Sequence, residues 1–574
     1  MNRTVTPLVV IAAFGVAGLA ACSSGNGRAP AEPADILLTN GRVVTLDEGQ
    51  PEAAAVSIRG DRIHALGSAD EMNRHVGRET QVIDLQGQLV IPGFIEGHGH
   101  FMGLGRAAMQ LDLMNTTSWE EIVRMVAEQV KTARPGQWIY GRGWHQEKWT
   151  TPPVLNVEGF PTHASLDAVS RDNPVVLTHA SGHASFVNGK AMELSGLTRR
   201  TPDPPGGEII RDANGHPTGA LRETASGLIR SGAGEPELGE DGRLERARRA
   251  LDLAGKEALS KGITSFQDAG SSFADIDLMK AMVDEGALGV RLWVMIRASN
   301  RELEENLAKY RMVDYGNGFL TVRAIKHSID GALGSRGAWL LEPYADKPDS
   351  TGLNTTPVET IAATASLALE HDYQLCVHAI GDRANRETLD LFEKAFAAHR
   401  GGKDLRWRVE HAQHLHPADI PRFGRLGVIA SMQGVHCTSD APYVRARLGE
   451  QRAQEGAYMW QALRGSGAVI VNGTDAPVED VDPIASYYSS VTRKRADGSV
   501  FFPGQRMTRL EALKSYTIDA AYAAFEEGSK GTLAPGKYAD MVVLSKDILT
   551  IPEDEIPAAT VSYTIVGGKV RYSR

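Results

Sequence analysis

Short apolar runs alternate with amphipathic stretches of helical period through most of the chain. This alternation is typical of βα repeats, in which parallel strands form one sheet and helices cover it. Eight of the runs are suitable strands, and eight parallel strands close a TIM barrel, the (β/α)8 fold. We therefore predict an α/β barrel, with helices for example over residues 243–261, 385–400 and 508–527. The predicted strands centre on Ile95, Phe266, Trp293, Ala324, Cys376, Val409, Ala430 and Val471.

The two ends of the chain have a different pattern, with short alternating strands separated by turn residues. Neither end alone has enough strands to close a core. We therefore expect residues 35–92 and 525–574 to form one small β-sandwich and residues 93–524 to form the barrel. Residues 101–261, between the first two barrel strands, are too many for a loop, so an inserted subdomain is predicted there.

The N-terminus has the layout of a secretory signal, with Arg3 followed by an uncharged apolar stretch up to Ala21. The stretch is shorter than the roughly 20 residues that span a bilayer as a helix. Its end, LAAC, resembles the bacterial lipobox, which predicts a signal peptide over 1–21 and lipidation of Cys22. Residues 22–34 are rich in Ser, Gly, Pro and Ala and are typical of a flexible tether. We expect a protein of the cell envelope, on its periplasmic or surface side, that contacts the membrane only through its lipid.

Composition narrows the range of functions. The chain has 574 residues, of which 42% are hydrophobic, so it can bury large cores. Its 61 Lys and Arg against 71 Asp and Glu give a net charge of −10 without a basic block, which argues against a nucleic-acid partner. Three cysteines exclude a disulfide framework and a cysteine-rich zinc site. A small-molecule substrate is the expected partner, and a homodimer is the default assembly.

Candidate chemistry lies where the predicted strands end. His98 and His100 close the first strand, and residues two apart on a strand point to the same side. The carboxyl ends of barrel strands meet at one mouth, so polar residues placed there converge. Imidazoles together with a carboxylate are typical ligands of a hydrolytic ion such as Zn²⁺. Four more polar residues close later strands, namely Lys326, His378, His411 and Asp475.

These residues stand in ordered motifs that resemble a known family. The series of ligand residues, within PGFIEGHGH and NGTDAP at its two ends, is similar to that of the amidohydrolase superfamily. Finer motifs are similar to its YtcJ-like branch, amidohydrolase 3, which includes N-substituted formamide deformylases. They are NGRVVTLDE, HASFVNGKAMELSGL, GGEIIRDANGHPTGALRE, IKHSIDGALGSRGAWLLEPY, VHAIGDRANRETLDLFE, RVEHAQ and GTLAPGKYADMVVL. The resemblance runs from about Asp35 to the C-terminus. It implies the barrel fold and a metal-dependent hydrolase of non-peptide C–N bonds.

The resemblance also implies a role for each strand-end residue. His98, His100 and Asp475 would hold a first ion, and His378 and His411 a second. Lys326 stands where many members carry a CO₂-modified lysine that bridges two ions. The alternative for Lys326 is an ordinary lysine paired with Asp330, and the number of ions, one or two, stays open with it.

The expected mechanism is attack by a metal-activated hydroxide, with Asp475 as the general base. Two alternatives remain: an ester, lactone or phosphoester hydrolase with the same site, and a surface lipoprotein that binds a metal or ligand without turnover.

Other polar residues are weaker candidates. His183, Arg383, Gln433 and His436 are predicted to bind substrate, although His183 could equally be structural and Arg383 could face solvent. Glu410 precedes His411 on its strand, so it should point the opposite way and be structural.

Overall fold

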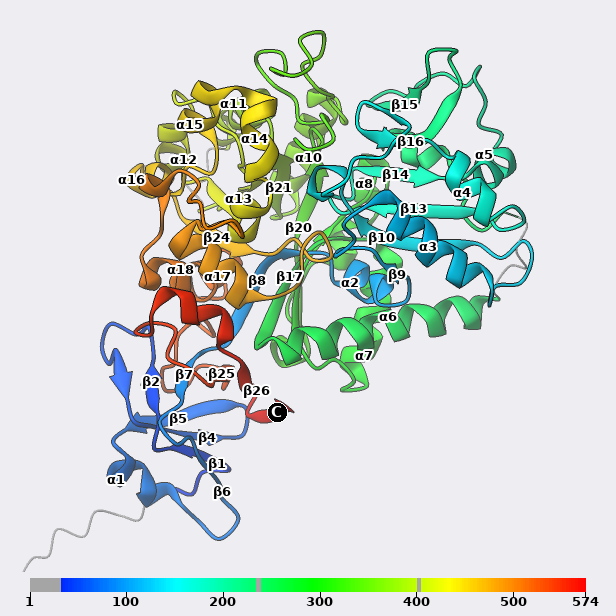
Figure 1. The fold of residues 1–574 in the computed structure, drawn as a ribbon. Helices are drawn as coiled ribbons and strands as arrows, with labels where there is room; N and C mark the ends of the chain where they lie inside the picture. Colours follow the sequence, from blue (N-terminus) through cyan, green and yellow to red (C-terminus); the bar gives the residue numbers. More distant parts are fainter. Residues whose placement is uncertain (1–31, 234–238, 400–403) are drawn as a thin grey trace, which may run out of the picture.

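The computed structural model describes residues 32–233, 239–399 and 404–574 (Figure 1). The predicted signal peptide and Cys22 lie outside these residues, as does most of the predicted tether. No helix among the described residues is long and apolar enough to cross a membrane.

The centre of the molecule is the predicted barrel, in which each strand pairs in parallel with the next. All eight predicted strands are present, so the TIM-barrel prediction is confirmed. They are β8 (Phe94–Gly99), β17 (Ile263–Ser271), β18 (Arg291–Ile296), β20 (Leu320–Ser328), β21 (Gln374–Ala379), β22 (Arg408–His411), β23 (Ile429–Gln433) and β24 (Ile470–Gly473).

The last strand, β24, lies beside the first, β8, and two glycines allow this approach. A Cβ at Gly97 would lie 2.4 Å from the carbonyl oxygen of Asn472, and one at Gly473 would lie 2.6 Å from the backbone nitrogen of His98. A backbone hydrogen bond of 2.8 Å from Asp475 to His98 joins the strand ends. The junction therefore sets the distance between two of the predicted ligands.

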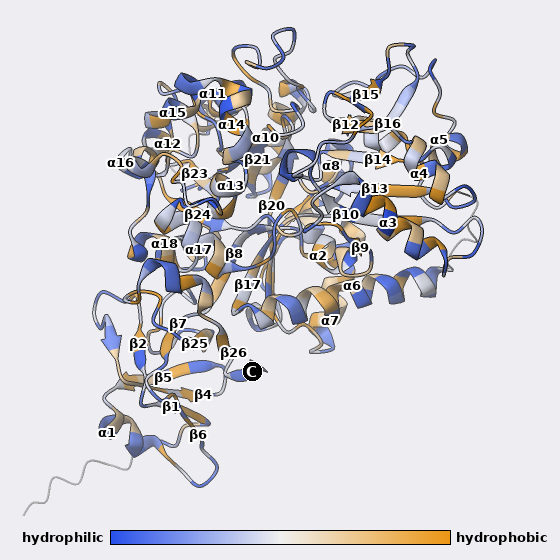
Figure 2. Cartoon of the chain, viewed as in Figure 1, coloured by the Kyte–Doolittle hydropathy of each residue, from blue (hydrophilic) through white to orange (hydrophobic). Residues whose placement is uncertain are grey.

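Helices cover the outside of the barrel, and Figure 2 shows their outer faces as mostly hydrophilic, as on α6. Residues 508–527 form two helices instead of the one expected, because the backbone at Thr517 is not helical, with φ −135° and ψ −98°. Beside this break the hydroxyl of Tyr516 donates to the carbonyl of Gly473 at 3.0 Å. The main helices are α6 (Glu240–Ser260), α7 (Phe273–Asp284), α8 (Asn300–Tyr310), α10 (Val358–Glu370), α11 (Asp382–Ala398), α12 (Ile420–Leu426), α16 (Trp460–Gly465), α17 (Pro483–Thr492), α18 (Arg509–Ser515) and α19 (Ile518–Ala523).

Two sheets pack together at the lower left of Figure 1 to form the small sandwich. Their shared core includes Leu38, Val56, Met541 and Ile565, so residues from both chain ends complete it. One sheet has β1 (Ile36–Thr39), β4 (Ala55–Arg59), β5 (Arg62–Gly67) and β6 (Gln81–Asp84). The other has β2 (Arg42–Val44), β3 (Glu52–Ala53), β7 (Leu89–Pro92), β25 (Met541–Leu544), β26 (Val561–Val566) and β27 (Lys569–Ser573).

A third sheet follows the first barrel strand and lies at the upper right of Figure 1. Helix α2 (Phe101–Ala107) packs on α6 and on β17, so both helices belong to the barrel layer and the separate sheet spans residues 111–223. Helix α3 (Trp119–Val130) covers this sheet. Its strands are β9 (Leu111–Asp112), β10 (Ile139–Trp144), β13 (Val175–His179), β14 (Ala184–Val187), β15 (Gly207–Arg211) and β16 (Pro217–Glu223).

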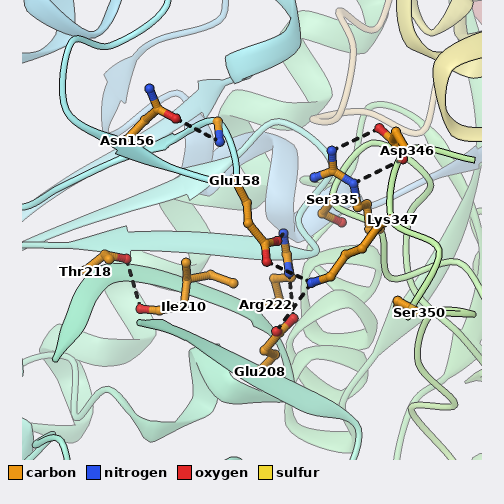
Figure 3. A network of polar contacts seen from close by, with 12 residues as sticks. Asn156, Glu158, Glu208, Ile210, Thr218, Arg222, Ser335, Asp346, Lys347 and Ser350 are labelled. Carbon is orange, nitrogen blue, oxygen red and sulfur yellow. Dashed lines mark hydrogen bonds and ion pairs between the residues drawn. The ribbon is translucent and has the colours of Figure 1, made fainter. Parts of the chain in front are cut away.

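Ion pairs fasten this inserted sheet to the barrel (Figure 3). Buried Arg222, on β16, binds Glu158 and Glu208 at 2.6 Å each. Lys347, from the long segment that follows β20, reaches Glu158 at 2.8 Å. The insert is therefore held over the barrel mouth by charges from both parts of the chain.

Candidate active site

The predicted site residues meet at the carboxyl ends of the barrel strands, around a cavity of about 520 Å³. His100, Lys326, His378, His411 and Asp475 all line this cavity. His98 lies beneath them and is only 1% exposed. The convergence expected from the strand ends is therefore present in the fold.

The first strand and the last supply the tightest group. Nε2 of His100 lies 3.2 Å from Oδ1 of Asp475, and Nε2 of His98 lies 3.4 Å from the same oxygen. Nζ of Lys326 is 3.4 Å from Nε2 of His98. His411 joins this group, since its ligand atom and those of His98 and Asp475 all lie within 4.8 Å of one another. His411 therefore lies close to both predicted pairs of histidines, so the structure does not clearly separate the two predicted sets of ligands.

Left-handed backbone turns two of these side chains into the cavity. His411 has a φ of +76° and Asp475 a φ of +57°, conformations that non-glycine residues adopt rarely and mostly at functional positions. On a regular strand His411 would point away from its neighbour Glu410. The backbone at His411 breaks that alternation, so both residues serve the site.

Glu410 is therefore not the outward-facing residue that the sequence predicted. Its carboxylate contacts Nδ1 of His98 and also binds Arg408 at 2.7 Å, and both acidic and basic side chains are fully buried. Arg408 also donates to the carbonyl of Gly97 at 2.7 Å, on the strand that carries His98. Glu410 thereby orients a predicted ligand from behind.

The same arrangement recurs at two other histidines. Nδ1 of His411 donates to Oε1 of Gln433 at 2.7 Å, and Nδ1 of His183 donates to Glu223 at 2.7 Å. A hydrogen bond at Nδ1 fixes the ring and leaves Nε2 free for a ligand or a substrate. Gln433 is 2% exposed and contacts His411 from behind, and its predicted contact with substrate stays a prediction.

The remaining predicted substrate residues separate into two groups. His183 lines the main cavity, and His183 and His436 both line a smaller cavity of about 40 Å³ beside Asp475. Arg383 lies outside both cavities, where it stacks over Trp339 at 4.4 Å and pairs with Glu387 at 3.8 Å. The simpler expectation for Arg383, an outward-facing side chain, is the one the structure shows.

Burial shapes the protonation of the cluster. It lowers the pKa of Lys326 to about 8 and that of His100 to about 4, so the imidazole is neutral at pH 7. Burial also raises the pKa of the Asp475 carboxyl, but the nearby imidazoles of His100 and His98 outweigh it and the net pKa is well below the usual value. The site therefore presents a neutral imidazole at His100 and an ionised carboxylate at Asp475.

The donor atoms fit a cation. Oδ1 of Asp475 and Nε2 of His378 are buried and have no hydrogen-bond partner, although Nε2 of His100 lies 3.2 Å from the first and Oδ1 of Asp330 lies 3.5 Å from the second. Buried polar atoms without a partner are costly and rare. Convergent imidazole nitrogens and a carboxylate oxygen are the ligand type of Zn²⁺ and related divalent ions.

The alternative pairing of Lys326 with Asp330 is not formed. The Asp330 carboxylate instead accepts hydrogen bonds from the backbone nitrogens of Trp339, Ile380 and Gly381, at 2.8 to 3.0 Å. Lys326 is left beside His98, buried and without a carboxylate at contact distance among the described residues. A lysine in this setting has the partly neutral amine that carbamylation requires.

The sequence prediction missed two arginines of the cavity wall, Arg142 and Arg297. Arg297 directly follows β18, so the strand-end rule applied to that strand would have found it. Arg142 lies on the insert strand β10, where nothing in the sequence indicates that the strand reaches the barrel mouth.

Comparison with known proteins agrees with this geometry. The sequence profile described as Amidohydrolase family matches residues 81–572, and the chain belongs to that family. It is 34% identical to Protein LONG AFTER FAR-RED 3 of Arabidopsis thaliana over 94% of this chain and 92% of the relative. It is 32% identical to the Bacillus subtilis protein named Putative amidohydrolase YtcJ, over 93% and 98% of the two chains.

A third relative and a solved structure give the class of reaction. The chain is 26% identical to N-substituted formamide deformylase of Arthrobacter pascens, over 94% of this chain and 98% of the relative. It is similar to an uncharacterized metal-dependent hydrolase from Pyrococcus furiosus, with a TM-score of 0.68, 28% identity, and coverage of 90% and 100%. Together with the family, these matches indicate a metal-dependent hydrolase.

Proposed function

We propose that this protein hydrolyses the C–N bond of a non-peptide amide, formamide or cyclic amide, and that it uses zinc for the reaction. The observation that carries the proposal is the approach of His98 and His100 to one unpartnered oxygen of Asp475. The family membership and the similarity to a formamide deformylase support the choice of bond.

The cluster offers ligands for one ion or two. His98, His100 and Asp475 would hold the first, and His378 and His411 would complete the site, with a carbamate on Lys326 as the bridge if two ions bind. A divalent ion in such a site lowers the pKa of water from 15.7 to about 7 and polarises a carbonyl.

Asp475 is the proposed general base. Its ionised carboxylate faces the cavity and takes a proton from the attacking water, whose oxygen adds to the carbonyl carbon. The C–N bond then breaks, and the proton passes from Asp475 to the departing nitrogen. The products are a carboxylic acid and an amine, so the step balances without an oxidant or reductant.

His183 is proposed to bind the carbonyl oxygen. Glu223 fixes its ring, and the side chain lines the cavity beside the predicted ligand His378, 4.8 Å away between ring centres. Burial lowers the pKa of His183, but Glu223 outweighs it and the net pKa is raised, so a protonated ring can donate from Nε2. A preorganised donor at the oxygen where negative charge develops stabilises the transition state.

An Asp475→Asn variant tests the proposal in the zinc-loaded protein. Loss of the general base should lower kcat by about 10²- to 10⁴-fold on N-formyl and N-acyl substrates, with circular dichroism unchanged. Asp277→Asn on α7 removes an exposed carboxylate and serves as the control. Equal activity of the two variants would contradict the role of Asp475. Cleavage of lactones or phosphoesters but no amide would overturn the proposed bond, and no turnover by the wild type would favour a binding protein.

We further propose that the chain is anchored in the cell envelope by a lipid on Cys22. The support is the LAAC sequence after an apolar stretch. Expressed in a bacterium, the wild type should fractionate with membranes and Cys22→Ala should not. Recovery of both in the same fraction would contradict the anchor.

A further inference from the structure

Two arginines line the main cavity without an acidic partner. Arg142, from β10, donates to the carbonyls of Ala180 at 3.1 Å and Pro477 at 3.3 Å. Arg297, which follows β18, has one long hydrogen bond, 3.4 Å to the hydroxyl of Ser328. Neither arginine forms an ion pair with any carboxylate in the described parts of the chain. By contrast, Arg222, Arg291 and Arg408 each bind carboxylates closely.

The carboxylates of the cavity wall are already engaged. Glu223 accepts from His183, Asp330 accepts from three backbone amides, and Asp475 faces the predicted ligands. The positive charges of Arg142 and Arg297 are therefore not neutralised by the wall that contains them. The rest of this wall is polar and includes hydroxyl groups of Thr178, Ser181, Thr224, Ser328 and Thr355.

The two arginines lie on different sides of the predicted metal ligands. Arg142 binds the carbonyl of Pro477, two residues beyond Asp475. Arg297 lies at the end of β18, and its partner Ser328 is two residues beyond Lys326 on the neighbouring strand. Both arginines line the same cavity as Asp475, so a substrate that fills it with its scissile carbonyl near Asp475 can reach either guanidinium group.

We propose that the substrate of this site carries a carboxylate, that Arg297 binds it as the main contact, and that Arg142 assists. Guanidinium binds carboxylate in a planar, two-point geometry, and most of the donors of Arg297 have no protein partner. The inference rests on the proposed function and narrows it to N-acylated amino acids and related amido acids.

Binding and turnover tested side by side separate this inference from the proposed reaction. The probes are the N-formyl and N-acetyl derivatives of the twenty amino acids, each as the free acid and as the carboxamide. Calorimetry measures their binding to the zinc-loaded protein, and release of the amine measures turnover. The variants are Arg297→Gln, Arg297→Lys and Arg142→Gln. Arg248→Gln, which removes a charge on α6 that pairs with Glu285 and does not line the cavity, is the matched control.

The wild type and the control should bind at least one acid more than tenfold tighter than its carboxamide. Arg297→Gln should reduce that preference by about 10- to 100-fold, the range for hydrogen bonds to charged groups, and Arg297→Lys should recover part of it. Arg142→Gln should have a smaller effect, because two of its donors already bind backbone carbonyls.

Three results would overturn the inference: no acid bound by the wild type, equal binding of acids and carboxamides, or an acid preference that Arg297→Gln leaves intact. The last result would mean that the metal itself binds the carboxylate. An arginine-dependent preference without hydrolysis of any probe would keep the carboxylate site and reject the amide reaction. Hydrolysis of acids and carboxamides at equal rates and affinities would keep the amide reaction and reject the carboxylate site.

Discussion

The carboxylate of Glu410 contacts Nδ1 of His98, the most deeply buried of the predicted metal ligands. The contact fixes the imidazole so that Nε2 faces Asp475 and Lys326. Burial raises the pKa of the Glu410 carboxyl, but Arg408 and His98 outweigh it and hold the net pKa well below the usual value. An ionised carboxylate behind a histidine increases the basicity of that histidine toward a metal.

Replacing Glu410 should therefore weaken metal binding without any contact to the metal being lost. We expect Glu410→Gln to lower zinc affinity or activity by about 10- to 100-fold, as measured by competition with a chelator and by amide hydrolysis. Its partner Arg408 would remain buried, so the melting temperature should also fall. A variant that melts lower but binds zinc as tightly as the wild type would show that Glu410 has only a structural role.

Lys326 provides a test of the second ion. If its amine carries a carbamate, the nitrogen has formed a bond to the carbon of CO₂ and released one proton, and burial favours this by lowering the pKa of Lys326 to about 8. Mass spectrometry of the native protein should then show the added mass of one CO₂, which acid removes. Lys326→Ala should lose one zinc ion and at least about 100-fold in activity.

Short carboxylic acids added to Lys326→Ala should restore part of that activity, because they can replace the missing carbamate. Lys280→Ala, which changes an exposed lysine on α7, should behave as the wild type. An unmodified Lys326 and a single zinc ion in the fully active enzyme would establish the one-ion form of the site.

The ion pairs that hold the insert predict a pH dependence of stability. Burial raises the pKa of Glu158, but Arg222 and Lys347 outweigh it and lower the pKa to about 2, from the usual 4.5. Between these values the unfolded chain binds more protons than the folded one. The contribution of Glu158 to stability is thus complete above pH 4.5 and is lost as the pH falls toward 2.

Glu158→Gln should therefore lower the free energy of unfolding by about 1 kcal/mol at pH 7, a value reduced for solvent screening because about a third of the side chain is exposed. The difference from the wild type should shrink as the pH falls from 4.5 to 3. Thermal unfolding at several pH values measures it, with Glu245→Gln on α6 as the control. A difference that stays constant with pH would show that the ion pairs contribute nothing through the charge of Glu158.

Local sequence pattern was sufficient for the barrel and for most of the ligand cluster. Each barrel strand is an apolar run, and the polar residue that closes it is placed by the strand, as for His98, Lys326 and His378. The position of Glu410 was not predictable in this way, because it depends on the left-handed backbone at His411. The contact of Gln433 with His411 and the presence of Arg142 in the cavity wall were not predicted, because their partners, His411 and Pro477, are distant in sequence.

We expect one divalent ion to bind where His98, His100 and Asp475 converge, and hydrolysis to need this ion. Anomalous diffraction at the zinc absorption edge, from crystals of the zinc-loaded protein, would locate it. We predict a peak within coordination distance of Nε2 of His98, Nε2 of His100 and the carboxylate of Asp475, and loss of both peak and activity after chelation. An active protein with no peak at these atoms would contradict the account.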